Sequence, residues 1–181
     1  IISDAPSPLI QSMTETNINC NGASNGQIVI VSNGGTGAIQ FSIDNGTTFQ
    51  PSGTFTNLSP GTYDVVIADA NNCSTSSTAT ITEPAALQFN TNSTPASCGN
   101  SDGTLTINAN GGTGIYQYSI DNGTTFQPGS TFSNITAGNY LVVVTDANNC
   151  SVSGNGIVNN AAAPLISATA ITNVTCNGIN D

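Results

Sequence analysis

The sequence SIDNGTTFQP occupies Ser42–Pro51 and recurs, letter for letter, at Ser119–Pro128. Within it, Asp-Asn-Gly is a strong signal for a tight turn that ends a β-strand. Two further motifs, NGGTG and DANNCS, recur at the same spacing of 77 residues (42 to 119), at Asn33–Gly37 and Asn110–Gly114 and at Asp69–Ser74 and Asp146–Ser151. Self-similarity at a fixed period predicts a tandem array of one small structural unit.

Cysteines mark the head of each unit at Cys20, Cys98 and Cys176, which are spaced by 78 residues (20 to 98 to 176). We therefore expect two complete units, residues 1–83 and 84–161, and the start of a third, truncated unit at 162–181. This organisation is expected of a segment of a longer array of repeats.

Alternation of apolar and polar residues predicts strands throughout each unit. In the second copy, Thr104–Ala109 and Tyr116–Ile120 each place apolar residues at every other position, as a half-buried strand does. A more apolar strand follows at Tyr140–Val144, equivalent to Tyr63–Ile67 in the first copy, where Thr75–Thr82 is the last strand. Six or seven short strands per unit predict an all-β fold, with tandem Ig-like β-sandwich repeats of about 77 residues.

The charge of the chain limits the functions it can have. Lys+Arg is 0, His is 0 and Asp+Glu is 10, which gives a formal net charge of −10. Without cations the chain cannot bind nucleic acid by counterion release, nor can it be attracted to anionic lipids. The commonest general base and the amine nucleophile are also missing, so we expect no enzyme. No apolar run reaches the roughly 20 residues of a membrane span.

Five cysteines at repeat-locked positions, with no His and no CxxC, indicate disulfides. We expect the pairs Cys20–Cys73 and Cys98–Cys150, which leave Cys176 for a partner outside the chain. Such pairs meet at one end of a sandwich only if an even number of strands lies between the two cysteines. The alternative is free buried thiols. Disulfides indicate an oxidising compartment, so we expect an extracellular protein.

Four aspartates are candidates for calcium binding, because each stands beside amide oxygens that could also ligate Ca²⁺. They are Asp44, Asp69, Asp121 and Asp146. The alternative is that each carboxylate forms an Asx turn, since each loop holds one acid where a calcium loop normally brings three or more. We expect no other cofactor.

Two further groups of residues have a structural and a functional interpretation. Tyr63 and Tyr140 follow a turn and open a late strand, which is typical of a tyrosine corner, although an aromatic platform for sugar is the alternative. Val29 and Val31 should lie on the outer face of their strand, where the second unit has Thr106 and Asn108. They are candidates for contact with a neighbouring unit, or are simply tolerated at the surface.

The complete unit closely resembles the SprB-type repeat, which forms long tandem arrays in cell-surface adhesins of gliding Bacteroidetes and in related secreted surface proteins. The matching motifs are T-x-x-x-C-x-G, G-G-T-G, aromatic-x-aromatic-S-I-D-N-G, F-x-N-L-x-P-G-T-Y and D-A-N-N-C. In the first unit they lie at Thr16–Gly22, Gly34–Gly37, Phe41–Gly46, Phe55–Tyr63 and Asp69–Cys73. In the second they lie at Ser97–Gly99, Gly111–Gly114, Tyr118–Gly123, Phe132–Tyr140 and Asp146–Cys150. These motifs are turn and core signatures, so the resemblance implies a surface filament or adhesin stalk without catalytic residues.

The sequence therefore predicts a structural repeat segment of an extracellular bacterial surface filament or adhesin stalk. Its expected partners are neighbouring repeats, of the same chain or of identical chains. Because the linker at Glu83-Pro84 is short and proline restricts φ, consecutive units should form a semi-rigid rod. One alternative is a glycan-binding adhesin module, which would present an exposed aromatic cluster at a loop end, although the chain has no Trp. The other is a glycosidase or other enzyme, which would need two carboxylates about 5–10 Å apart in a cleft.

Overall fold

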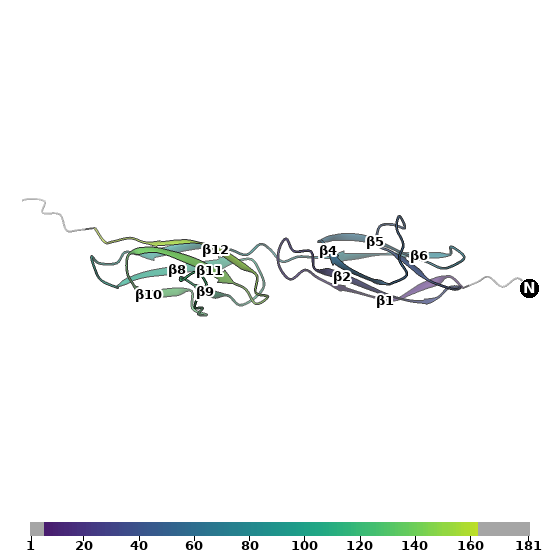
Figure 1. The fold of residues 1–181 in the computed structure, drawn as a ribbon, viewed down its shortest axis with the longest axis horizontal. Helices are drawn as coiled ribbons and strands as arrows, with labels where there is room; N and C mark the ends of the chain where they lie inside the picture. The colour runs from purple at the N-terminus through teal and green to yellow at the C-terminus, as the bar shows by residue number, and fades with distance from the viewer. Residues whose placement is uncertain (1–5, 163–181) are drawn as a thin grey trace, which may run out of the picture.

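A computed structural model describes residues 6–162. Within this range the chain forms twelve β-strands and no helix (Figure 1), which confirms the all-β prediction. The two units lie end to end along the long axis of the molecule. Residues 163–181, which hold Cys176 and nearly all of the expected third unit, lie outside the described range.

The first unit is a sandwich of two three-stranded antiparallel sheets. Its strands are β1 (Pro8–Thr16), β2 (Gly26–Gly34), β3 (Gln40–Ser42), β4 (Thr54–Leu58), β5 (Gly61–Ala68) and β6 (Ser74–Ile81). One sheet has the order β1-β2-β4 and the other β3-β5-β6. Six strands per unit agree with the six or seven that the alternation of the sequence predicts.

The second unit repeats this arrangement strand for strand. It consists of β7 (Gln88–Thr94), β8 (Gly103–Asn110), β9 (Gln117–Ser119), β10 (Thr131–Ile135), β11 (Gly138–Thr145) and β12 (Ser151–Val158). The orders β10-β8-β7 and β12-β11-β9 correspond to those of the first unit. Near-identical turn motifs in the sequence therefore produce the same connections twice.

The repeated Asp-Asn-Gly motif makes the tight turn that follows β3. Asn45 and Gly46 have φ values of 57° and 78°, and two consecutive positive φ values are typical of a type I′ turn. The chain then runs back along β3, where the backbones of Phe41 and Gln50 exchange two hydrogen bonds of 2.8 and 2.9 Å. This returning segment lies between β3 and β4 without joining either three-stranded sheet.

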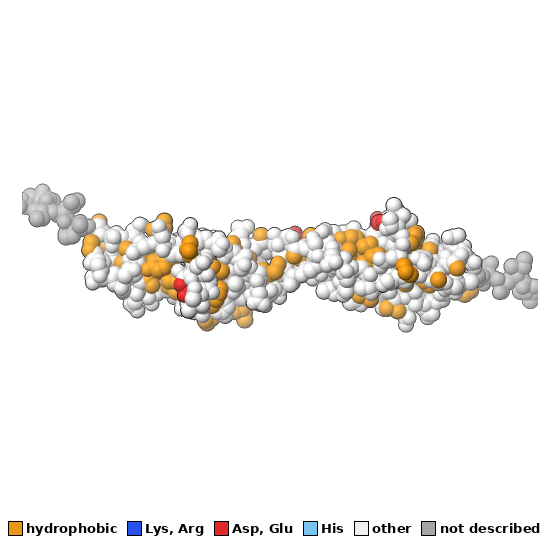
Figure 2. Space-filling model, in the orientation of Figure 1, with side chains coloured by type: hydrophobic (Ala, Val, Ile, Leu, Met, Phe, Trp, Pro, Cys, Tyr) orange, Lys and Arg blue, Asp and Glu red, His pale blue; other side chains and the backbone are white. Residues whose placement is uncertain are grey.

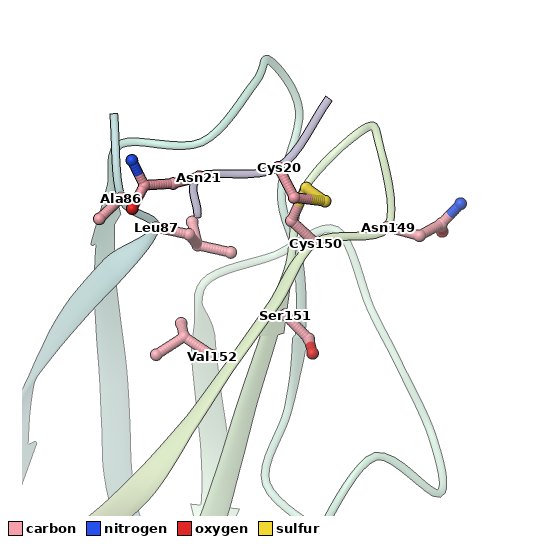
Figure 3. Close-up of a pocket in the computed structure, with 8 residues that line it drawn as sticks. All are labelled: Cys20, Asn21, Ala86, Leu87, Asn149, Cys150, Ser151 and Val152. Atoms are coloured by element: carbon pink, nitrogen blue, oxygen red, sulfur yellow. A yellow bond between two sulfur atoms is a disulfide. The ribbon is translucent and has the colours of Figure 1, made fainter. Parts of the chain in front are cut away.

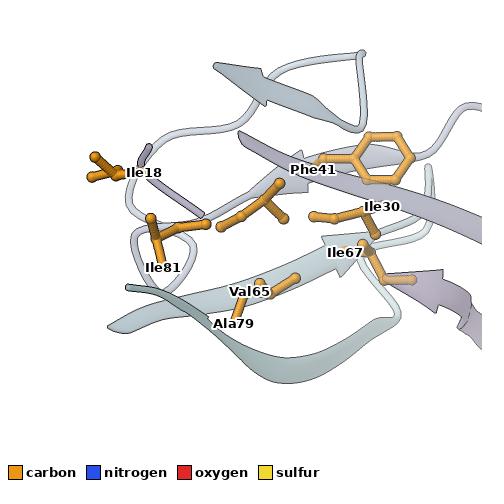
Figure 4. Close-up of a cluster of buried hydrophobic side chains, with 8 residues drawn as sticks. Ile18, Ile30, Phe41, Val65, Ile67, Ala79 and Ile81 are labelled. Carbon is orange, nitrogen blue, oxygen red and sulfur yellow. The ribbon is translucent and has the colours of Figure 1, made fainter. Parts of the chain in front are cut away.

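Each unit has its own hydrophobic core. The first is formed by residues between 18 and 81 and the second by residues between 96 and 158. In the first, Ile30 of β2 faces Val65 and Ile67 of β5 across the sandwich (Figure 4), and Ile28 of β2 belongs to the same buried cluster. Burial of one such side chain contributes about 1.5–3 kcal/mol, so these inward-facing positions supply most of the driving force for folding.

Tyr63 and Tyr140 form tyrosine corners, as the sequence predicts. Each hydroxyl donates a 2.8 Å hydrogen bond to the carbonyl four residues upstream, of Ser59 and Thr136 respectively. Both side chains are half-buried and pack against the cores of their units. The hydroxyl therefore pins the turn that precedes β5 or β11.

The chain enters and leaves each unit at opposite ends. Just after β1, the backbone N–H of Ile18 donates a 2.9 Å bond to the carbonyl of Thr82, just after β6. Ala96 and Asn159 make the equivalent 2.9 Å bond in the second unit. The segment that follows the first strand thus runs beside the segment that leads out to the next unit.

Glycines fit the linker against the second unit. The N–H of Gly112 donates a 2.8 Å bond to the carbonyl of Ala85 in the linker. Gly111 has a φ of +75°, and a Cβ atom there would lie 2.0 Å from the carbonyl oxygen of Ala86. Both its backbone conformation and this close approach therefore require glycine.

We predict that Gly111→Ala destabilises the second unit more than Gly99→Ala. Gly99 has the same φ of +75° but no atom within 4 Å of its Cβ position, so it serves as a matched control. The left-handed conformation should cost about 1–2 kcal/mol in both variants, and the clash with the linker adds to this cost only at Gly111. Differential scanning calorimetry measures the difference, and equal melting temperatures for the two variants would contradict the prediction.

Candidate functional site

The junction between the two units is held by a disulfide between Cys20 and Cys150. The Cα atoms are 5.6 Å apart, and the two residues are separated by 130 positions in the sequence. The bridge therefore joins the head cysteine of the first unit to the tail cysteine of the second (Figure 3). In the chain-entropy model, closing a loop of this length stabilises the folded chain by about 5 kcal/mol.

This bridge corrects the expected pairs Cys20–Cys73 and Cys98–Cys150. Cys73 immediately precedes β6, whereas Cys20 lies near Thr82, just after β6. β6 has eight residues, so its ends are roughly 25 Å apart at about 3.3 Å per residue. A disulfide needs Cα atoms within about 7 Å, so the two cysteines of one unit cannot bond.

The expected pairing failed because of the returning segment between β3 and β4. The loop after β2 contacts the turn after β5, since the N–H of Thr36 donates a 2.9 Å bond to the Asp69 carboxylate. β2 and β5 therefore run in the same direction, and β4 and β3, which are antiparallel to them, share the opposite one. Four strands separate the cysteines, but the returning segment adds a fifth crossing and places them at opposite ends.

Backbone and amide hydrogen bonds surround the bridge. The side-chain amide of Asn148, in the second unit, donates a 3.0 Å bond to the carbonyl of Asn19. On the linker side, the Asn21 amide donates to the carbonyl of Pro84 at 3.1 Å, and the N–H of Gly22 donates to Glu83 at 2.7 Å. The linker is thus tied to the first unit through the Pro84 carbonyl and the Glu83 side chain, and to the second unit through the Ala85 carbonyl, which accepts the bond from Gly112.

A hollow of about 460 Å³ lies beside the bridge. It is lined by Cys20, Asn21, Ala86, Leu87, Asn149, Cys150, Ser151 and Val152. No lining side chain is ionisable apart from the two cysteines, which are bonded to each other. The residues that line the hollow therefore include no group for acid–base catalysis. The chemical feature of this site is the disulfide bond between the two units.

Cys73 and Cys98 are free thiols. Cys98 is exposed and Cys73 is half-buried, so the alternative of buried free thiols does not describe Cys98. Cys176, which was expected to lack its partner, lies outside the described residues.

Asp44 and Asp121 act as turn formers. The Asp44 carboxylate accepts hydrogen bonds from the Ser42 hydroxyl at 2.7 Å, the Thr48 N–H at 2.9 Å and the Thr48 hydroxyl at 2.6 Å. The bonds from Thr48 and Ser42 lower the pKa of Asp44 to about 2. Hydrogen bonds from the Ser119 hydroxyl and from Thr125 lower the pKa of Asp121 to about 2 as well.

Asp69 and Asp146 close the turn that holds each tail cysteine. Asp69 accepts 2.9 Å bonds from the N–H groups of Asn71 and Cys73, and its other oxygen accepts one from Thr36, which lowers its pKa. Asp146 makes the equivalent three bonds in the second unit. Among residues 6–162, no three His, Cys, Asp or Glu side chains come together as a group that could hold a metal ion. The Asx-turn interpretation accounts for the contacts of all four aspartates.

We predict that the folded chain loses stability between about pH 4 and pH 2. The pKa values of Asp44 and Asp121 in the folded state, about 2, lie below the ordinary value of 3.8. Their contribution is therefore complete above about pH 4 and is lost as the pH falls toward 2. Because the chain has no Lys, Arg or His, repulsion between positive side chains cannot cause this loss.

Calorimetry across pH 2–7 measures the effect. The double variant Asp44→Asn/Asp121→Asn should melt at a lower temperature near neutral pH and show a smaller decrease in acid, because it lacks the two titrating groups. A melting temperature of the unmodified chain that stays constant down to pH 2 would rule out this account of the turns.

Val29 and Val31 lie on the outer face of β2, as expected. Val29 is half-buried and Val31 is 44% exposed. The junction contacts described above involve other residues, so a contact of these valines with a neighbouring unit stays a prediction. The face shown in Figure 2 carries isolated acidic groups and scattered apolar side chains.

Comparison with known protein families gives a match in both units. The family model of the SprB repeat matches residues 12–48 and again residues 90–125. The two matched segments start near the same point of each unit, in β1 and β7. No curated protein matches the chain. A search of the described residues for a helix long and apolar enough to cross a membrane finds none.

Proposed function

We propose that this chain, which carries two SprB repeats, is a non-catalytic structural segment of an extracellular bacterial filament or adhesin stalk. The family supports this proposal, because SprB repeats occur in cell-surface proteins. The observation that carries it is the bridge from Cys20 to Cys150, which joins consecutive units covalently. A disulfide of this kind persists in an oxidising compartment.

The position of the bridge suits a segment that carries tension. Tension applied to the ends of the chain enters through β1, which ends at Thr16, and reaches Cys20. It then crosses to Cys150 and leaves through β12, which begins at the next residue. Residues 21–149 lie outside this covalent path, so unfolding them cannot lengthen the stalk.

The chemistry of the surface also supports a structural role. Acidic side chains are isolated on the face in Figure 2, and the ten acidic residues give every part of an array the same sign of charge. Like-charged rods repel one another at low salt, which discourages lateral aggregation. The role calls for no cofactor.

Among the described residues, the large exposed aromatic side chains are Phe49 (44%) and Phe126 (43%), one in each unit, whereas the glycan-binding alternative predicts an exposed cluster. This alternative relied on Tyr63 and Tyr140 as exposed platforms, but both side chains are half-buried and their hydroxyls bond to the backbone. We therefore propose the stalk role alone.

Immunogold electron microscopy of the cells that produce the protein tests this proposal. Antibodies raised against the purified chain should label extended structures outside intact cells. An antibody against a cytoplasmic enzyme serves as the control and should label only permeabilised cells. If the chain is also labelled only after permeabilisation, the proposed extracellular role is wrong.

A further inference from the structure

The bridge at the junction pairs two positions that occur in both units, so the same pairing can be repeated between further units. It joins a head cysteine, Cys20, to the tail cysteine of the unit that follows, Cys150. The chain holds each of these positions twice, since Cys98 is the head cysteine of the second unit and Cys73 the tail cysteine of the first. The partners that this pairing assigns to Cys98 and Cys73 lie in units beyond these two.

Cys98 has the surroundings of Cys20. In both units the backbone two residues before the head cysteine bonds to the segment that leaves the unit, from Ile18 to Thr82 and from Ala96 to Asn159, each at 2.9 Å. The second unit adds a further bond, from the N–H of Ala161 to the carbonyl of Ala96 at 2.7 Å. Cys98 is therefore held, exposed, at the end of the second unit where the chain continues.

Cys73 has the surroundings of Cys150. The Asp69 carboxylate holds the Cys73 N–H at 2.9 Å, as Asp146 holds that of Cys150 at 2.9 Å. The asparagines that precede the two cysteines, Asn72 and Asn149, both have a φ of 62°. The same turn thus holds a disulfide-bonded cysteine, Cys150, in the second unit and a free cysteine, Cys73, in the first.

We propose that Cys98 forms a disulfide with the tail cysteine of a following SprB unit and that Cys73 forms one with the head cysteine of a preceding unit. The partner is in each case another copy of this unit, supplied by the same polypeptide or by a neighbouring chain. This inference rests on the proposed stalk role and makes it more specific. Each unit in the array is then bonded to both of its neighbours, and two covalent paths run along the stalk.

Each new bridge is a two-electron oxidation. Two thiols lose two protons and two electrons as the S–S bond forms, and a disulfide oxidant accepts both and becomes two thiols. In the oxidising compartment the oxidant is a protein disulfide, and in the experiment it is glutathione disulfide, which becomes two molecules of glutathione.

Two variants of the full chain, each with a single free thiol, test the pairing when they are mixed. Both carry Cys176→Ser, and one also carries Cys73→Ser while the other carries Cys98→Ser. Each retains the Cys20–Cys150 bridge and one of the two free thiols. With glutathione disulfide, a covalent dimer should form in the mixture, through Cys98 of one variant and Cys73 of the other. Each variant alone should stay monomeric on a non-reducing gel.

A lengthened chain tests pairing within one polypeptide. In the full chain with residues 84–160 duplicated in tandem, also carrying Cys176→Ser, Cys98 of the first copy should bond to Cys150 of the second. Thiol labelling should then find two free cysteines, where an unpaired Cys98 and its partner would raise the number to four.

The two experiments together decide both the pairing and its source. A mixed dimer shows that another chain can supply the partner, and a bridge in the lengthened chain alone shows that the same polypeptide supplies it. The proposal is overturned if neither bridge forms, or if each variant alone dimerises as readily as the mixture. In that case the stalk role stands separately, because labelling at the cell surface does not depend on these bridges.

Discussion

The covalent bond between Cys20 and Cys150 is the constraint on which the arrangement of the two units depends. This bond is possible only because the chain enters each sandwich at one end and leaves it at the other. The head cysteine then stands beside the departing linker, and the tail cysteine of the next unit faces it. In a sandwich with both cysteines at one end, the disulfide would instead form within one unit, and only the linker would connect the two units.

The linker and the bridge restrain the junction from two sides. Asn21 and Gly22 bond to Pro84 and Glu83, while Gly112 bonds to Ala85 on the other side. A hinge needs backbone that is free to change its φ and ψ angles, and here the linker carbonyls are engaged by both units. The rod expected from the short linker thus has a stronger cause than proline, since a second covalent connection lies beside the first.

Sequence reasoning predicted what depends on local patterns. Alternation located the strands, the Asn-Gly pair located the turn at Asn45, and the tyrosine corners followed from the position of Tyr63 and Tyr140. The disulfide partners could not be predicted in this way, because they depend on the number of times the chain crosses the sandwich. The returning segment that contains Gln50 forms an isolated β-bridge with Phe41 and one backbone bond between Gly53 and Ile30, but no continuous strand. No strand pattern therefore marks it, yet it decides at which end Cys73 lies.

Disulfide mapping of the purified, unreduced chain tests the central claim most directly. Because the chain has no Lys or Arg, a protease that cleaves at Asp and Glu is used, on the chain carrying Cys176→Ser. Cys20 and Cys150 then lie on two separate fragments, and Cys73 and Cys98 share a third, because the bond between Glu83 and Pro84 resists cleavage. Mass spectrometry should find the fragment that contains Cys20 joined to the one that contains Cys150. If the fragments that contain Cys20 and Cys150 are instead each joined to the one that contains Cys73 and Cys98, the account is contradicted.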